Sequence, residues 1–181
     1  MSNDLMKLSK FLSLILRHDP DRIGLSLDTN GWADVEELIA RANDHGKALT
    51  LPILERIVAE NDKKRFAFND DGTRIRASQG HSIEIELDLP PARPPELLYH
   101  GTATRSTASI RATGLHSGDR QHVHLSLDEA TATRVGQRHG KPVVLTIRSG
   151  EMCRQGHLFF LSANGVWLTS RVPAEFIEFP E

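Results

Sequence analysis

The chain contains one cysteine, Cys153, in 181 residues, and no run of apolar residues long enough to cross a bilayer. A single cysteine excludes an intramolecular disulfide framework, and a membrane span needs about 18 or more apolar residues. The first ten residues, MSNDLMKLSK, show no basic stretch leading into an apolar core and a cleavage site. We therefore expect a cytoplasmic protein with no membrane partner.

Two common nucleotide-binding motifs are also missing. No G-x-G-x-x-G follows a predicted strand and no G-x-x-x-x-G-K-[ST] occurs, so neither a Rossmann fingerprint nor a P-loop is present. Neither half is strongly basic, because residues 1–89 carry 12 Lys and Arg against 16 Asp and Glu, and residues 90–181 carry 10 against 8. A sequence-independent grip on a long nucleic acid needs many cations. This balance of charges favours a local pocket that binds one or a few phosphates.

The first part of the chain predicts three short helices. Apolar residues follow the i, i+3, i+4, i+7 spacing of one helix face from Leu8 onward, and Pro20 opposes continuation of that helix. Asp34, followed three residues later by Glu37, has the pattern of a capping box at the start of a second helix. Thr50 precedes a third apolar-periodic stretch. The sequence thus places Arg17 and His18 in the last turn of the first helix or just beyond it.

A β-hairpin and a proline-rich segment follow. Residues 65–68 and 74–77 flank the turn signal NDDGT at 69–73, which predicts a hairpin. Helices followed by a hairpin resemble a winged helix, so we assign a winged-helix lobe to residues 1–89. Residues 90–96, PPARPPE, are stiff and poor in amide donors, and we expect them to form the linker.

The remaining residues, 97–181, predict a mixed lobe, so the fold class is α+β. We expect Phe159 and Trp167 in its core. The β-rich runs cover 97–100, 123–126, 143–148, 157–162, 166–169 and 175–179, and the helical stretches cover 106–112 and 128–138.

Four residues are candidates for chemistry on a phosphate: Arg17, His18, Arg65 and Arg138. Arginine presents a planar set of donors that fits two phosphate oxygens and stays charged, and histidine can donate a proton near neutral pH. Each has a structural alternative. Arg17 and His18 could be solvated groups at a helix end, Arg65 an edge-strand charge, and Arg138 a charge that complements a helix dipole.

A metal site is an alternative for the histidines of the second lobe. His122 and His124 are two residues apart on a predicted strand and so face the same side. A catalytic zinc site needs a third protein ligand, for which no recognised spacing exists here. The possible third ligands are His100, His116 and Asp119.

The sequence as a whole resembles the KptA-type RNA 2′-phosphotransferases. The segments that carry the resemblance are, in chain order, LSKFLSLILRHDP, GWADVEELI, NDKKRF, YHGT, HVHLS, VGQRHGKPVVL and NGVWLTSRVPAEF. The resemblance covers essentially the whole length. It implies a winged-helix lobe that holds RNA, an ADP-ribosyltransferase-like lobe at 97–181 that holds NAD, and an active site between them.

The resemblance also implies site residues. The family's catalytic set falls on Arg17, His18, Arg65 and Arg138. Val166 stands where related ADP-ribosyltransferases often place a glutamate. The residues implied for the NAD pocket are His100, Gly101, Thr102, His124, Ser126 and Val166.

The implied reaction has two steps. The internal 2′-phosphate of RNA attacks the nicotinamide ribose of NAD and expels nicotinamide, and the ribose 2″-hydroxyl then attacks the phosphorus. The products are RNA with a free 2′-hydroxyl and ADP-ribose 1″,2″-cyclic phosphate. An apolar Val166 suits this scheme, because a phosphate is already anionic and needs no general base. We expect NAD as co-substrate, no metal, RNA as the partner, and a monomer without an obligate protein partner.

Two other functions stay open. An ADP-ribosyltransferase that modifies terminal phosphates of nucleic acid would stop after the first step and leave ADP-ribose on its product. A winged-helix DNA-binding regulator is the other, and the acidic balance of residues 1–89 opposes it.

Overall fold

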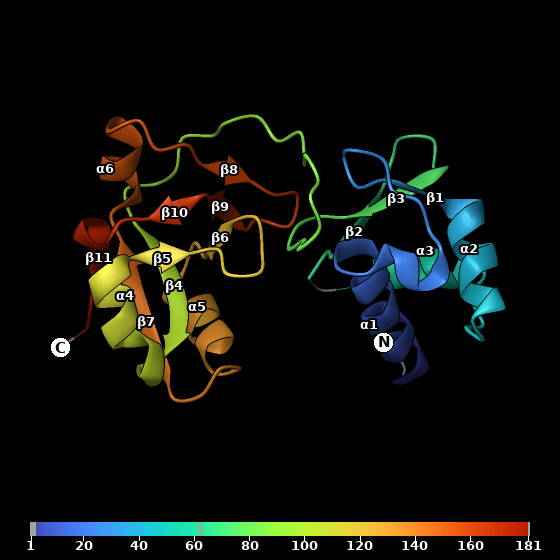
Figure 1. Cartoon of the computed structure of the whole chain (residues 1–181), viewed down its shortest axis with the longest axis horizontal. Helices are drawn as coiled ribbons and strands as arrows, with labels where there is room; N and C mark the ends of the chain where they lie inside the picture. Colours follow the sequence, from blue (N-terminus) through green and yellow to red (C-terminus); the bar gives the residue numbers. More distant parts are fainter. Residues whose placement is uncertain (1–2, 62, 181) are drawn as a thin grey trace. The chain divides into compact units, whose positions relative to one another are not determined.

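The structure, a computed structural model, describes residues 3–61 and 63–180. The chain divides into two compact units, Met1–Asp88 and Leu89–Glu181 (Figure 1). Each unit has its own cluster of buried apolar side chains. Among the helices that the structure describes, none has the length and apolar character needed to cross a membrane.

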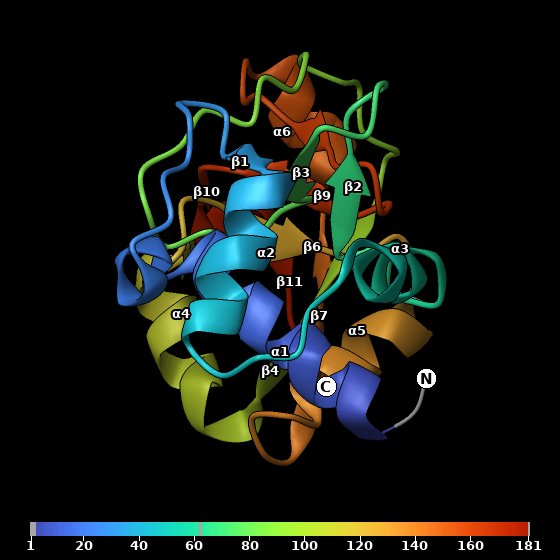
Figure 2. The ribbon, with the colours of Figure 1, turned by 90° about the vertical axis from the view of Figure 1, so that its right-hand side faces the viewer.

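The first unit combines helices with a small antiparallel sheet of order β1-β3-β2. Helix α1 contacts both α3 and β3, and Figure 2 shows both helices. The elements are α1 (Asn3–Arg17), the 3-10 helix η1 (Pro20–Ile23), β1 (Ala33–Asp34), α2 (Val35–Asp44), α3 (Leu51–Ala59), β2 (Phe66–Phe68) and β3 (Arg74–Ala77).

Sequence signals account for these elements. Helix α1 buries Leu12, Ile15 and Leu16 completely, which lie on one face at helical spacing. The Asp34 carboxylate caps α2 by accepting from the Glu37 amide over 2.9 Å, the bond expected of an N-cap residue. The predicted three helices and the hairpin are confirmed.

The second unit is built on a three-stranded antiparallel sheet of order β11-β7-β4, which α5 contacts through both β4 and β7. A second sheet has the order β6-β9-β8, and β10 pairs with β5. The strands are β4 (Leu98–Ala103), β5 (Leu115–His116), β6 (Val123–Leu125), β7 (Pro142–Ile147), β8 (Phe160–Leu161), β9 (Trp167–Thr169), β10 (Arg171–Val172) and β11 (Ile177–Glu178). The helices are η2 (Thr104–Ser106), α4 (Thr107–Thr113), α5 (Glu129–Gly136), α6 (Ser149–Arg154) and η3 (Ala174–Phe176).

The two larger sheets of this unit meet at Tyr99 and Ser126. The Tyr99 amide donates to the Ser126 carbonyl over 2.9 Å, and the Ser126 amide donates back over 2.7 Å. This isolated bridge ties β4 to the end of β6. Phe159 and Trp167 are buried in the core beneath, as predicted.

Several details differ from the sequence-based expectation. Helix α6 and the pair β5 and β10 were not expected, and α5 ends at Gly136, before Arg138. Residues 90–96, expected to be a linker, are bonded to the second unit. The Ala92 amide donates to the Phe159 carbonyl over 2.8 Å, and the Pro95 carbonyl accepts from Ser149 Oγ over 2.8 Å. Prolines lack amide donors but keep their carbonyls, so such a segment can still be tied down.

Candidate functional site

In the first unit, the expected phosphate-binding residues Arg17, His18 and Arg65 come together; we call them the Arg–His cluster. Arg17 is the last residue of α1, and His18 follows it. Arg17 Nη2 donates to the Arg65 carbonyl oxygen over 3.4 Å. Residues 48 positions apart in the sequence are thereby joined.

The ends of the hairpin hold this arrangement. Arg65 directly precedes β2, and its carbonyl also accepts from the Ser78 amide over 2.9 Å. Ser78 Oγ donates to the carbonyl of Lys64 over 2.8 Å. Because Lys64 adopts a positive φ of 41°, which is uncommon for a residue with a side chain, the chain reverses just before Arg65. The position of Arg65 is thus set by two hydrogen bonds from Ser78, one to the Arg65 carbonyl and one to the Lys64 carbonyl.

Ser82 joins the same cluster from the segment after β3. Its amide donates to the Arg17 carbonyl over 3.0 Å, which satisfies one of the carbonyls left over at a helix C-terminus. Its hydroxyl lies 2.9 Å from Nδ1 of His18, within hydrogen-bond distance. A single residue therefore contacts both members of the Arg17–His18 pair.

Behind Ser82, the imidazole of His81 is buried and only 2% exposed. Neither of its ring nitrogens has a hydrogen-bond partner among the residues that the structure describes. Burial lowers the pKa of His81 to about 3, and the charges of Arg17, His18 and Arg76 contribute to the same shift. His81 is therefore neutral at physiological pH and adds no charge to the cluster.

In the second unit, the expected NAD residues gather where β4 meets β6; we call this place the sheet junction. The Nδ1 atom of His100 lies 3.1 Å from the His124 carbonyl oxygen. A carbonyl can only accept, so His100 carries a proton on Nδ1. Burial lowers the pKa of His100, against the opposite effect of this bond, which favours the neutral ring. Its Nε2 is then a hydrogen-bond acceptor.

His124 has the complementary arrangement. Arg120 Nη1 lies 2.8 Å from the Nδ1 atom of His124. A guanidinium can only donate, so Nδ1 accepts and the ring proton of His124 lies on Nε2. The junction thus combines an acceptor on His100 with the cation of Arg120. A ligand that carries hydroxyl groups and phosphates matches these two functions.

Val166 and Ser126 lie at the same junction. The last pair between β6 and β9 is Leu125 with Trp167, and continuing this antiparallel register by one residue sets Ser126 opposite Val166. Val166 directly precedes β9, after a turn closed by its own amide, which donates to Ser162 Oγ over 3.0 Å. Both side chains are half-buried. The structure thus has an apolar side chain at this edge.

Gly101 and Thr102 continue β4 beyond His100, and both are buried. A Cβ atom at Gly101 would collide with the main-chain carbonyl of Ala132 in α5. A Cβ atom at Gly136 would press on the Thr102 carbonyl. The absence of a side chain at Gly101 is therefore explained by the close packing of α5 on β4.

Arg138 lies in the loop after α5 and is exposed. Its amide donates to the Val135 carbonyl over 3.2 Å, and the next residue, His139, donates to the Gly136 carbonyl over 2.9 Å. The charge of His139 contributes to the lowered pKa of His100. The loop that carries Arg138 thus lies near the sheet junction.

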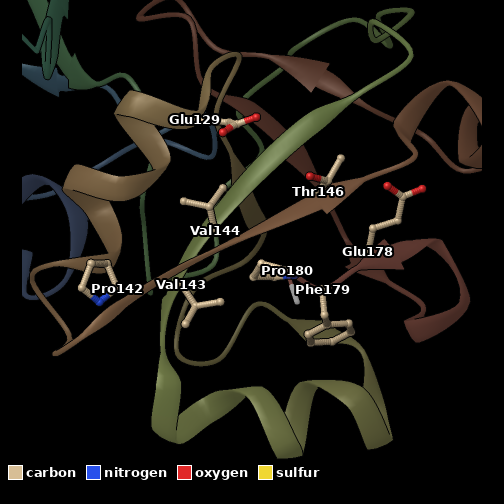
Figure 3. Close-up of a pocket in the computed structure, with 8 residues that line it drawn as sticks. All are labelled: Glu129, Pro142, Val143, Val144, Thr146, Glu178, Phe179 and Pro180. Carbon is tan, nitrogen blue, oxygen red and sulfur yellow. The ribbon is translucent and has the colours of Figure 1, made fainter.

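A separate hollow of about 520 Å³ opens along β7 (Figure 3). Its edges carry the carboxylates of Glu129 and Glu178. It contains none of the predicted site residues, and two carboxylates disfavour a phosphate ligand. The Arg–His cluster in the first unit and the sheet junction in the second therefore stay two separate candidate sites, each described by itself.

The ring of His122 lies against an aromatic side chain. Its ring makes an edge contact with Phe160 at 6.0 Å between centroids, and burial lowers its pKa. Within residues 3–61 and 63–180, no group of three His, Cys, Asp or Glu side chains is placed to hold a metal ion.

Sequence reasoning missed three residues of the site: His81, Ser82 and Arg120. His81 and Ser82 follow β3 without any periodic pattern, and Arg120 lies in a loop four residues before His124. Ser82 and His81 lie near Arg17 and His18, which are more than 60 positions away in the sequence, and Arg120 contacts His124 from a loop. The run Gly80-His81-Ser82, with a histidine between small residues just after a strand, is the one local signal that could have drawn attention to this segment.

Comparison with known proteins agrees with the resemblance that the sequence motifs indicate. The family described as "RNA 2′-phosphotransferase, Tpt1 / KptA family" matches residues 3–171. A protein of Flavobacterium johnsoniae is 56% identical over 172 residues, 95% of this chain and 94% of that protein. A Burkholderia pseudomallei protein is 56% identical over 174 residues, 96% of this chain and 95% of that protein. A protein of Streptomyces coelicolor is 54% identical over 175 residues, 97% of this chain and 95% of that protein. Each of the three is named "Probable RNA 2′-phosphotransferase".

Proposed function

Because the chain belongs to the RNA 2′-phosphotransferase, Tpt1 / KptA family, we propose that it removes an internal 2′-phosphate from RNA in an NAD-dependent reaction. NAD supplies the ribose that accepts the phosphate, and nicotinamide is the leaving group. The final products are RNA with a 2′-hydroxyl, nicotinamide and ADP-ribose 1″,2″-cyclic phosphate.

The observation that carries this proposal is the convergence of Arg17, His18 and Arg65. The Arg17 guanidinium donates to the main-chain carbonyl of Arg65, and Ser82 contacts both Arg17 and His18, so the end of α1 meets the start of the hairpin. One guanidinium can donate to two phosphate oxygens at once and keeps its positive charge. We assign Arg17 and Arg65, together with Arg138, to gripping the 2′-phosphate.

The same arginines act in the second step. When the ribose 2″-hydroxyl attacks phosphorus, negative charge builds on the nonbridging oxygens, where fixed guanidiniums stabilise it. The bond from phosphorus to the RNA 2′-oxygen breaks, and that oxygen takes up a proton. We assign His18 to donating a hydrogen bond or a proton in this step, since imidazole titrates near neutral pH.

The sheet junction suits the dinucleotide. The acceptor on His100 matches a ribose hydroxyl, and the cation of Arg120, bonded to His124, matches phosphate oxygens. We assign His100, His124 and Ser126 to NAD. Val166, which has no acid–base function, is consistent with an acceptor that is already anionic.

The experiment that tests this proposal uses a synthetic RNA with one internal 2′-phosphate, incubated with the protein with and without NAD. Mass analysis of RNA and small products should show loss of the phosphate only with NAD. Retention of ADP-ribose on the RNA would instead support an enzyme that stops after the first step.

A further inference from the structure

A second hollow, of about 330 Å³, opens beside Arg65 in the first unit. We call it the Arg65 hollow. Helix α1 contributes Met6 and Lys10 to its lining, and the turn between α3 and β2 contributes Asn61, Lys63 and Arg65. One residue of the Arg–His cluster is therefore also part of this hollow.

Asn61 lines the hollow and is 4% exposed. Its Nδ2 donates to Ser9 Oγ in α1 over 3.3 Å, and its Oδ1 accepts from the Lys63 amide over 3.1 Å. The Asn61 carbonyl accepts from the Lys64 amide over 2.8 Å. A buried polar side chain thus fixes the turn to α1 and sets the main-chain course that leads to Arg65.

The hollow is cationic within an acidic unit. Among the described residues, Lys10, Lys63 and Arg65 line it together with the carboxylate of Glu60. This carboxylate accepts a hydrogen bond from Arg56 over 3.0 Å. The 88 residues of this unit carry 12 Lys and Arg against 16 Asp and Glu. Three cations around one hollow therefore run against the charge of the unit as a whole, and they favour an anionic ligand there.

An RNA with an internal 2′-phosphate carries such an anion next to the reacting group, because each neighbouring nucleotide is joined by a phosphodiester. The Arg65 carbonyl accepts from Arg17 Nη2, so the hollow adjoins the Arg–His cluster. Met6, which is 47% exposed, adds apolar surface beside the cations, against which a ribose or base can pack.

We propose that the Arg65 hollow binds the RNA nucleotide adjacent to the 2′-phosphorylated one, with its phosphodiester on Lys10 and Lys63. This inference rests on the proposed function, since it takes the 2′-phosphate to lie at the Arg–His cluster.

The test measures binding without NAD, by fluorescence anisotropy of a short RNA with one internal 2′-phosphate. A second RNA has uncharged methylphosphonate linkages on both sides of the phosphorylated nucleotide. The variants are Lys10→Gln, Lys63→Gln and their combination. Lys7→Gln is the matched control, because Lys7 lies on the same helix but does not line the hollow.

We expect the double variant to bind the charged RNA about tenfold more weakly, because two charge-assisted hydrogen bonds to the phosphodiester are removed. The slope of log affinity against log salt should fall in magnitude by about 0.7 for each phosphate that is no longer neutralised. Lys7→Gln should bind like wild type, and the methylphosphonate RNA should bind wild type and double variant equally.

Equal binding of the charged RNA by wild type and the double variant would overturn the proposal, as would an equal loss for both RNAs. The proposed function is decided separately, by adding NAD to the wild type. If the charged RNA depends on Lys10 and Lys63 for binding but is never dephosphorylated, the RNA subsite stands and the proposed reaction fails. If the wild type turns over and the double variant keeps its KM for RNA, the reaction stands and the subsite fails.

Discussion

The hydroxyl of Ser82 lies 2.9 Å from Nδ1 of His18, while the amide of Ser82 donates to the carbonyl of Arg17 over 3.0 Å. Ser82 thus contacts both the last residue of α1 and the ring of His18. The hydrogen bond from the Ser82 amide to the Arg17 carbonyl does not involve the side chain. Replacing Ser82 by alanine therefore removes only the contact between the hydroxyl and His18.

Ser82→Ala should lower kcat for RNA dephosphorylation roughly three- to tenfold, the effect of losing one orienting hydrogen bond. The KM for NAD should not change. Ser82→Thr, which keeps a hydroxyl, should recover most of the rate. Ser13→Ala is the matched control, because Ser13 Oγ donates within α1, to the Ser9 carbonyl. A Ser82→Ala enzyme as fast as wild type would show that this contact does not position His18.

Arg65→Ala and Arg138→Ala should each reduce kcat by roughly 100-fold or more, the size of effect seen when a fixed donor to a developing charge is removed. Arg65→Ala keeps the carbonyl that holds Arg17, so the loss reports on the guanidinium. Single-turnover assays at saturating RNA and NAD measure this effect. Arg56→Ala, on an exposed side chain paired with Glu60, should leave the rate nearly unchanged. Wild-type turnover in Arg65→Ala and Arg138→Ala would refute the assignment.

His81 should make stability depend on acid. Its pKa is about 3 in the folded protein, against an ordinary value of 6.5, so the unfolded chain binds the proton first as pH falls. The stability contribution of the neutral ring is complete above pH 6.5 and declines from there toward pH 3. Between pH 7 and pH 4 the wild type should lose about 3 kcal/mol through this residue.

Urea unfolding of wild type and His81→Leu at pH 7 and pH 4 measures this difference. The variant cannot take up the proton, so its unfolding free energy should fall by about 3 kcal/mol less over the interval. His116→Leu, at an exposed histidine, should keep the wild-type dependence. Identical pH dependence in wild type and His81→Leu would mean that His81 is not held neutral.

His100→Ala and His124→Ala should each weaken NAD binding by about tenfold, the change expected when a buried hydrogen-bonding group is removed. The KM for 2′-phosphorylated RNA should stay near wild type, because the Arg–His cluster is untouched. Calorimetric titration with NAD measures the affinity, and His116→Ala serves as the control. Unchanged NAD affinity in the double variant would remove both histidines from the dinucleotide site.

Much of the fold could be predicted because its signals are local. The end of α1 follows from Pro20, and the start of α2 follows from the Asp34 cap, whose bond to the Glu37 amide is present. Helix α6 is only six residues long, too short to show a helical period. Strands β5 and β10 have two residues each and pair across more than 50 positions, so no local pattern marks them.

The candidate site residues also differ in whether a local signal marks them. The resemblance to the family predicts Arg17, His18 and Arg65 as site residues, and the structure joins them through the Arg65 carbonyl and Ser82. Ser82 and Arg120 act by contacting His18 and His124, which the sequence alone does not bring together. Gly101 illustrates the opposite case. Its lack of a side chain is required by the Ala132 carbonyl, a packing constraint invisible in a strand-end motif.

The most direct test of the account is the NAD dependence of RNA dephosphorylation by the purified protein. The account predicts that an RNA with one internal 2′-phosphate loses that phosphate only when NAD is present, with nicotinamide and ADP-ribose 1″,2″-cyclic phosphate formed in equal amounts. A folded protein that leaves the phosphate in place with NAD, or removes it equally well without NAD, would contradict it.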